Sequence, residues 1–204
     1  MSFAAGAVPF SGLTARLLKG VDLRKTGTGT VSGSGLYEVA GFGPMAVAGS
    51  LEVAVGALGP LLAGRDRRVL GAVAGGLAVV GHNWSPLLSG AGGRGISTAL
   101  GASLVLAPEG TVLLGAGLGG GRLLRQTGLG CFLALVGLFP LLARRRGARG
   151  GLIAACLAIP VLAKRVLGNS AGGGGLSVRT FSRRLLLDSD GTRAAAVAVP
   201  AGVC

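Results

Sequence analysis

The polar stretch between residues 22 and 35 combines residue types that can bind a phosphate group. Its sequence is Asp22-Leu-Arg-Lys-Thr-Gly-Thr-Gly-Thr-Val-Ser-Gly-Ser-Gly35. Glycines let backbone N–H groups approach an anion, hydroxyls add further donors, and Arg24 and Lys25 supply positive charge. The stretch is therefore a candidate phosphate-binding loop. The alternative interpretation is a flexible loop rich in Gly, Ser and Thr.

A second polar connection reads Gly81-His-Asn-Trp-Ser-Pro86 and is followed by Gly90-Ala-Gly-Gly-Arg-Gly-Ile-Ser-Thr98. Glycines flank Arg94 directly before an apolar block, so backbone amides, a helix N-terminus and a guanidinium are predicted to converge on one anion. His82 lies in an uncharged block. A buried histidine in a membrane span is a functional candidate, although a hydrogen-bonded structural role is the alternative.

Long apolar blocks must position these polar connections. Residues 69–93 and 126–143 contain no Asp, Glu, Lys or Arg, residues 39–64 contain only Glu52, and residues 96–121 contain only Glu109. Each block is close to the ~17–25 residues that cross a bilayer as a helix. Residues 1–15 and 150–163 form shorter apolar blocks, and we expect these to be a truncated span and a partly inserted or snorkelling span.

The composition supports the same fold class. Of 204 residues 41 are Gly and only 13% are charged, whereas a soluble domain has about 7% Gly and about 25% charged residues. Small residues let membrane helices pack closely. The sequence therefore predicts an all-α, polytopic helical membrane protein with five to six hydrophobic segments. Residues 1–169 form the membrane domain in this prediction, and residues 170–204 form a flexible basic tail.

The net charge of +13 is carried by basic clusters between the apolar blocks, including Lys164 and Arg165. Such clusters anchor membrane proteins to anionic headgroups, so membrane lipid is the expected partner. Nucleic acid is not expected, because one Trp and one Tyr give no platform for stacking bases. A single His and three Cys without a Cys-x-x-Cys pattern argue against a metal site, and no cofactor is predicted. A transporter or channel is disfavoured because few ionisable residues lie in the apolar blocks.

Three segments resemble the motifs of the bacterial membrane acyl-phosphate:glycerol-3-phosphate acyltransferase family. They are Phe3-Ala-Ala-Gly-Ala-Val-Pro9, Asp22-Leu-Arg-Lys-Thr-Gly-Thr-Gly-Thr30 and Gly92-Gly-Arg-Gly-Ile-Ser-Thr98. The order and spacing resemble the family from about residue 3 to about residue 169, and the third segment is the most specific.

The resemblance implies transfer of an acyl group from acyl phosphate to glycerol 3-phosphate, giving lysophosphatidic acid, in a multi-pass protein of the bacterial plasma membrane. It also implies that Thr28 orients the acceptor hydroxyl, while either His82 or the phosphate of the substrate takes the proton. The substrate-binding residues that it implies are Arg24, Lys25, Gly27, Gly29, Thr30, Asn83, Gly92, Gly93, Arg94, Gly95 and Asn169.

Several positions depart from the family pattern. Thr28 and Thr30 replace a Ser and an Asn, and Val55 replaces a Lys in the segment Glu52-Val-Ala-Val55-Gly56. The C-terminal motif is reduced to Lys164-Arg165-Val-Leu-Gly168, with Asn169 beside it. A second hypothesis is therefore an inactive homologue with the same fold that binds membrane lipid or a partner.

Overall fold

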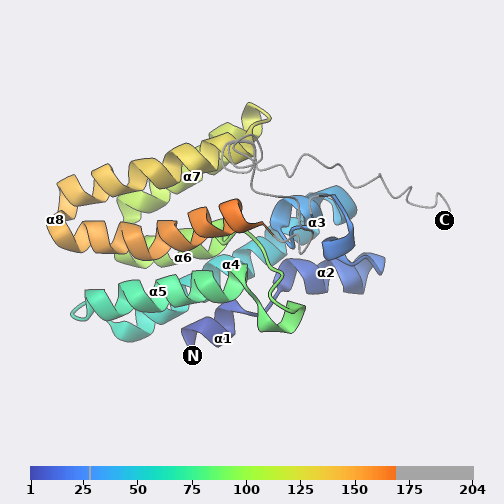
Figure 1. Cartoon of the computed structure of the whole chain (residues 1–204), viewed down its shortest axis with the longest axis horizontal. Helices are drawn as coiled ribbons and strands as arrows, with labels where there is room; N and C mark the ends of the chain where they lie inside the picture. The colour runs from blue at the N-terminus through green and yellow to red at the C-terminus, as the bar shows by residue number, and fades with distance from the viewer. Residues whose placement is uncertain (28, 169–204) are drawn as a thin grey trace.

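The computed structural model describes residues 1–27 and 29–168, and all regular structure in these residues is helical. Thr28, Asn169 and the predicted tail 170–204 lie outside the described residues. Figure 1 shows the longer helices lying largely alongside one another, with the short helices labelled α2 and α3 toward one end. The elements are α1 (Ser2–Gly6), α2 (Phe10–Lys19), η1 (Leu23–Lys25), α3 (Gly33–Ala40), α4 (Phe42–Ala63), α5 (Arg68–Asn83), η2 (Pro86–Leu88), α6 (Ile96–Leu106), α7 (Pro108–Leu123) and α8 (Thr127–Leu167).

The two polar connections become loops at the same end of this bundle. The first loop (residues 20–32) joins α2 to α3 and contains η1, and the second loop (residues 84–95) joins α5 to α6 and contains η2. Because α6 begins at Ile96, the segment from Gly92 to Thr98 lies partly in the second loop and partly in the first turn of α6.

The apolar block at residues 96–121 does not form the single span that the sequence predicts. It forms two helices, α6 and α7, separated at Ala107, whose backbone is extended with φ −157° and ψ 82°. Pro108 explains the break, because a proline disfavours the helical conformation of the residue before it and is well accommodated at the first position of the next helix. As a result, Ala107 lies between the end of α6 and the start of α7.

Helix α8 consists of two arms that fold back on each other. The bend lies at Gly147, whose φ of 61° and ψ of −146° are not helical, and the left-handed φ suits a glycine. Arg165, near the end of the second arm, donates from Nη2 to the Gly128 carbonyl at the start of the first arm, at 2.6 Å. The two apolar blocks at residues 126–143 and 150–163 are therefore antiparallel arms, as Figure 1 shows.

Small residues occupy the closest helix crossings, and larger apolar residues face outward. Gly101 of α6 lies against α4 so closely that a Cβ there would collide with the Val53 carbonyl oxygen. In contrast, Leu62 is 74% exposed and Val112 is 72% exposed. Burying small residues while exposing large apolar side chains is the distribution expected where lipid surrounds the bundle. Among the described residues, Phe42–Ala63 and Thr127–Leu167 are long and apolar enough to cross a membrane.

The Gly101→Ala variant should lower the thermal midpoint of the purified protein in detergent. The added methyl group would lie 2.7 Å from the Val53 carbonyl carbon and 3.0 Å from the Ala57 nitrogen, so α4 and α6 must separate, and overpacking of this kind costs ~1–3 kcal/mol. Gly49→Ala is the matched control because its methyl group would meet nothing within 4 Å. Equal midpoints for the two variants would contradict the close crossing.

Candidate functional site

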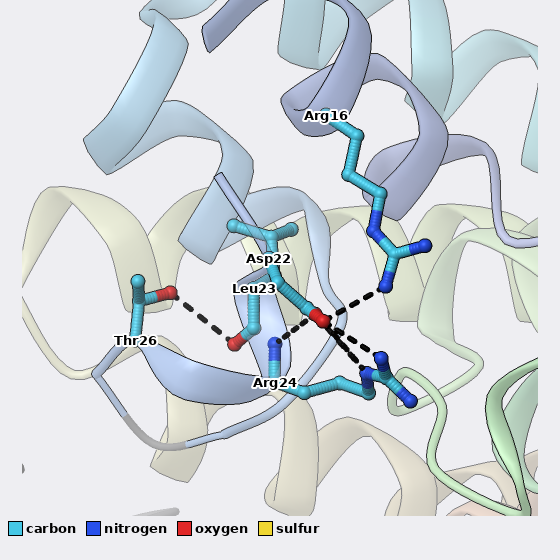
Figure 2. A network of polar contacts seen from close by, with 5 residues as sticks. All are labelled: Arg16, Asp22, Leu23, Arg24 and Thr26. Atoms are coloured by element: carbon cyan, nitrogen blue, oxygen red, sulfur yellow. Dashed lines mark hydrogen bonds and ion pairs between the residues drawn. The ribbon is translucent and has the colours of Figure 1, made fainter. Parts of the chain in front are cut away.

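Asp22 organises the start of the first loop. Its carboxylate caps η1 by accepting from the Arg24 backbone N–H at 3.1 Å, and it also forms ion pairs with Arg24 at 2.7 Å and Arg16 at 2.8 Å. Figure 2 shows both guanidinium groups directed at this one carboxylate. The Arg24 guanidinium is thus already bound within the loop, and a phosphate would have to compete with Asp22 for it.

These contacts lower the pKa of the Asp22 carboxyl well below its usual range. The side-chain hydrogen bond from Arg24 is the largest cause, and burial opposes it. The same contact raises the pKa of Arg24. Asp22 is therefore ionised throughout the neutral and mildly acidic range, and it offsets part of the positive charge of the first loop.

The end of the first loop pairs with the second loop. The Val31 N–H donates to the Gly92 carbonyl at 3.2 Å, and Arg94 donates from Nη2 to the Thr30 hydroxyl at 3.3 Å. Thr30 is only 6% exposed. The two predicted phosphate-binding segments are therefore in direct contact, although 64 positions separate Thr30 from Arg94.

Glycines let the second loop lie against the end of α5. The Gly93 N–H donates to the His82 carbonyl at 3.2 Å. A Cβ at Gly93 would collide with Nε2 of His82 and lie 2.8 Å from the Val31 carbonyl oxygen, and a Cβ at Gly92 would lie 2.5 Å from the Asn83 carbonyl oxygen. The His82 imidazole is thus packed on the Gly93 backbone, and it makes no hydrogen bond to another residue in the described part of the chain.

Asn83 ties the end of α5 to α8. Its Nδ2 donates to the Pro160 carbonyl at 2.9 Å, and its side chain is fully buried. The Oδ1 atom has no hydrogen-bond partner among the described residues. A Cβ at Gly95 would lie 2.6 Å from that Oδ1 atom. Asn83 therefore links the end of α5 to α8, close to the residue that precedes α6.

Lys164 of α8 reaches the second loop, which the sequence analysis does not predict. Its Nζ donates to the Gly90 carbonyl at 3.3 Å and lies 5.2 Å from the centre of the Trp84 ring. Lys164 and Arg165 are each only 2% exposed, so the interpretation of this pair as headgroup anchors is wrong. A basic residue at the end of an apolar block has the same local pattern whether it points outward or inward, so the only sequence signal at this position is the reduced C-terminal motif Lys164-Arg165-Val-Leu-Gly168.

A buried hydrogen-bonded pair, Ser11 and Glu52, lies close to the end of the first loop. The Ser11 hydroxyl of α2 donates to Glu52 Oε1 of α4 at 2.7 Å, and the two residues are 1% and 3% exposed. The neighbouring Gly12 has Val31 directly against it, since a Cβ there would lie 2.9 Å from Val31 Cγ1. The pair thus joins α2 to α4 beside the point where the two loops meet.

The structure brings most, but not all, of the predicted site residues together. The converging residues are Thr30, His82, Asn83, Gly92, Gly93, Arg94 and Gly95. Gly29 lies beside the Arg24 carbonyl, at 3.3 Å from a Cβ built on Gly29, whereas Lys25 and Gly27 are exposed. Thr28 and Asn169 lie outside the described residues. Among residues 1–27 and 29–168, no group of three His, Cys, Asp or Glu side chains could hold a metal ion.

This arrangement is suited to binding an anion rather than to metal chemistry. Arg94 and Lys164 bring two positive side chains to the second loop, whose Gly93 N–H is bonded to the His82 carbonyl. Low exposure strengthens each of these interactions, because water screens a charge less when it is partly buried.

Comparisons with known proteins agree with this picture. A family model described as Glycerol-3-phosphate acyltransferase matches residues 1–170. The crystal structure of PlsY (YgiH), described as an integral membrane glycerol 3-phosphate acyltransferase, is similar in its glycerol 3-phosphate form, with a TM-score of 0.73, 22% identity and coverage of 80% of this chain and 84% of that chain. Its lysophosphatidic acid form has a TM-score of 0.71 and 21% identity at the same coverage. At this identity the likeness shows the fold. No curated protein matches the sequence.

The Asp22→Asn variant should be destabilised at neutral pH by up to about 1 kcal/mol, because it keeps a capping oxygen but loses both ion pairs. The folded pKa of Asp22 is lowered, so its contribution is present above the unfolded pKa of about 3.9 and is lost as pH falls through the folded pKa. The thermal midpoints of the wild type and of Asp22→Asn, measured against pH, should therefore converge only in strong acid.

The exposed carboxylate Asp66 provides the control, and Asp66→Asn should have no effect of this kind. A deficit of the Asp22→Asn variant that stayed constant from neutral pH to strong acid would show that charge is not its cause.

Proposed function

The chain belongs to the glycerol-3-phosphate acyltransferase family, and from this membership we propose that it transfers an acyl group from acyl phosphate to glycerol 3-phosphate. The product would be lysophosphatidic acid, a precursor in phospholipid biosynthesis. The observation that carries the proposal is the direct contact of the two anion-binding loops, in which Arg94 donates to Thr30 and the Val31 N–H donates to Gly92. PlsY is described with glycerol 3-phosphate and with lysophosphatidic acid in its two forms.

The reaction that we propose needs alignment more than it needs strong activation. The acceptor hydroxyl oxygen attacks the acyl carbonyl carbon, the bond from that carbon to the phosphate oxygen breaks, and inorganic phosphate leaves. Acyl phosphate is an activated donor, so orientation and stabilisation of the negative charge that develops on the carbonyl oxygen supply most of the acceleration. Arg94 would bind phosphate. The Gly93 N–H now donates to the His82 carbonyl, so it would serve the developing oxyanion only after that bond opens.

The hydroxyl proton has two candidate acceptors in this proposal. His82 lies against Gly93, and an imidazole is the side chain that most often acts as a general base. The phosphate of the substrate can also take the proton. Thr28, which would orient the acceptor hydroxyl, follows Gly27 in the first loop. Arg24, Lys25, Gly27, Gly29 and Asn169 complete the proposed substrate-binding set, with Arg24 engaged by Asp22 until a phosphate displaces it.

We place the chain in the bacterial plasma membrane as a multi-pass protein. The support is the outward distribution of large apolar side chains such as Leu61 (61% exposed) and Leu133 (59% exposed) on α4 and α8. Both substrates suit this location, because the acyl chain dissolves in lipid while each phosphate remains at the aqueous end of the bundle.

One observation favours a second candidate, an inactive homologue that binds lipid or a partner. The His82 imidazole has no hydrogen-bond partner among the described residues to fix its orientation, and a general base is normally oriented by a second group. In this case the loops would bind a phosphate-bearing lipid without turning it over.

A turnover assay separates the two candidates. Purified protein in detergent or in lipid nanodiscs should form lysophosphatidic acid from acyl phosphate and glycerol 3-phosphate, with release of one phosphate per product. An active PlsY preparation provides the positive control. Binding of acyl phosphate without product formation would refute the acyltransferase and support the binding protein.

The Arg94→Ala variant should raise KM for glycerol 3-phosphate by about ten-fold or more, because a hydrogen bond from a charged donor contributes ~1.5–3 kcal/mol. The matched control is Arg68→Ala, which removes an exposed arginine at the start of α5. Initial rates measured at several glycerol 3-phosphate concentrations give KM for both variants. An unchanged KM in Arg94→Ala would exclude Arg94 as a phosphate ligand.

A further inference from the structure

We propose that Ser11 and Glu52 are positioning residues of the candidate site and act through the end of the first loop. The Ser11 hydroxyl of α2 donates to Glu52 Oε1 of α4 at 2.7 Å. Neither residue belongs to the set of predicted site residues. The inference rests on the proposed function only for the identity of the substrate, glycerol 3-phosphate, whose binding the pair would affect from a distance.

The first argument is the position of an ionisable residue inside an apolar helix. Glu52 lies in the middle of α4 and is only 3% exposed. Its hydrogen-bond donor is the Ser11 hydroxyl, and no Lys or Arg in residues 1–27 and 29–168 forms an ion pair with it. Such residues are costly within a membrane domain and usually serve a function. An apolar pair of similar volume would often be as stable, so stability alone does not account for this pair.

The second argument is the weak hold that the remaining contacts have on α2. Beside Ser11, the buried side of α2 carries Gly12 and Ala15, whereas Leu13 and Leu17 are 44% and 84% exposed. Packing of such small groups has little directional preference, so it would let α2 slide or rotate on α4. A buried polar pair fixes the register of two helices, because a shift leaves both groups unpaired.

The third argument is the contact between α2 and the end of the first loop. A Cβ at Gly12 would lie 2.9 Å from Val31 Cγ1, and Val31 belongs to a hydrophobic cluster that includes residues of α2. The Val31 N–H donates to the Gly92 carbonyl, and the preceding Thr30 accepts from Arg94. A displacement of α2 would therefore displace Val31 and weaken the contact between the two loops.

The double variant Ser11→Ala/Glu52→Met tests the proposal without leaving an unpaired buried polar group. Replacing both partners with apolar groups can be nearly neutral for stability, so the protein should fold, but the register of α2 is no longer fixed. KM for glycerol 3-phosphate should rise about five-fold, as for the loss of one hydrogen bond, with little change in kcat because binding is affected. Amide hydrogen exchange in a peptide covering residues 29–33, which contains the Val31 N–H, should become faster. Wild-type KM and exchange in the folded double variant would overturn the proposal.

Two single variants supply the controls. Ser103→Ala removes a fully buried hydroxyl from α6, where it donates to the Ala107 carbonyl at 3.1 Å. It should lower the thermal midpoint but leave KM and the exchange of residues 29–33 unchanged. Glu52→Gln keeps an oxygen that accepts from Ser11, and it should retain the wild-type KM and exchange. If Ser103→Ala or Glu52→Gln behaved like the double variant, lost stability or lost charge would be the cause, and the proposal would fail.

A double-mutant cycle tests the path through the loops. In an Arg94→Ala background, the replacement of Ser11 and Glu52 should raise KM for glycerol 3-phosphate little further, because both changes act on the same contact. Independent, additive effects would overturn the path from α2 to the second loop.

The outcomes also separate this inference from the proposed function, since hydrogen exchange requires no turnover. Faster exchange in the double variant, in a protein that forms no lysophosphatidic acid, would retain the positioning role and reject the acyltransferase. Turnover by the wild type, with wild-type KM and exchange in the double variant, would do the reverse. If the double variant does not fold, Ser11→Cys decides the question. Its thiol is a weak donor, so KM and exchange should both rise by a smaller factor, and wild-type values would overturn the proposal.

Discussion

The site depends on the missing side chains at Gly92 and Gly93. These two residues lie between the last turn of α5 and residue 31, where a Cβ would meet the carbonyl oxygens of Asn83 and Val31 at 2.5 and 2.8 Å. The backbone of the second loop can therefore bond to His82 on one side and to Val31 on the other. Any larger residue would separate the two loops and remove Thr30 from Arg94.

Helix packing of the same physical kind places the elements that carry these loops. Gly56 and Gly101 let α4 and α6 approach until their backbones touch, and this brings the start of α6 beside the chain that follows α2. The Ser11–Glu52 hydrogen bond then fixes α2 on α4. Small residues thus act at two scales, first by bringing the helices together and then by bringing the loops together.

The sequence predicts local features of the site better than its long-range contacts. The helical class and the two glycine-rich loops follow from residue types and spacing, and the same pattern makes Arg94 a candidate phosphate ligand. The contact between Thr30 and Arg94 follows from the way α2 and α3 pack on α4, which spacing does not encode. Lys164 is harder still, since its contact with Gly90 spans 74 positions and depends on the bend at Gly147. The break at Ala107 is different, because Pro108 is a sequence signal for a helix boundary. The prediction of a single span followed from the uniform hydrophobicity of the residues around it.

Burial, rather than the number of basic residues, decides which cations of this chain can select an anion. The first loop has more positive charge in its sequence, yet Arg24 is paired with Asp22, and Lys25 is exposed to solvent that screens it. Exposed ion pairs contribute about 0–1 kcal/mol. Arg94 is half-buried and Lys164 is almost fully buried, and charges with restricted access to water interact more strongly with a ligand that reaches them. Under the proposed function, the second loop is therefore better suited than the first to select a phosphate.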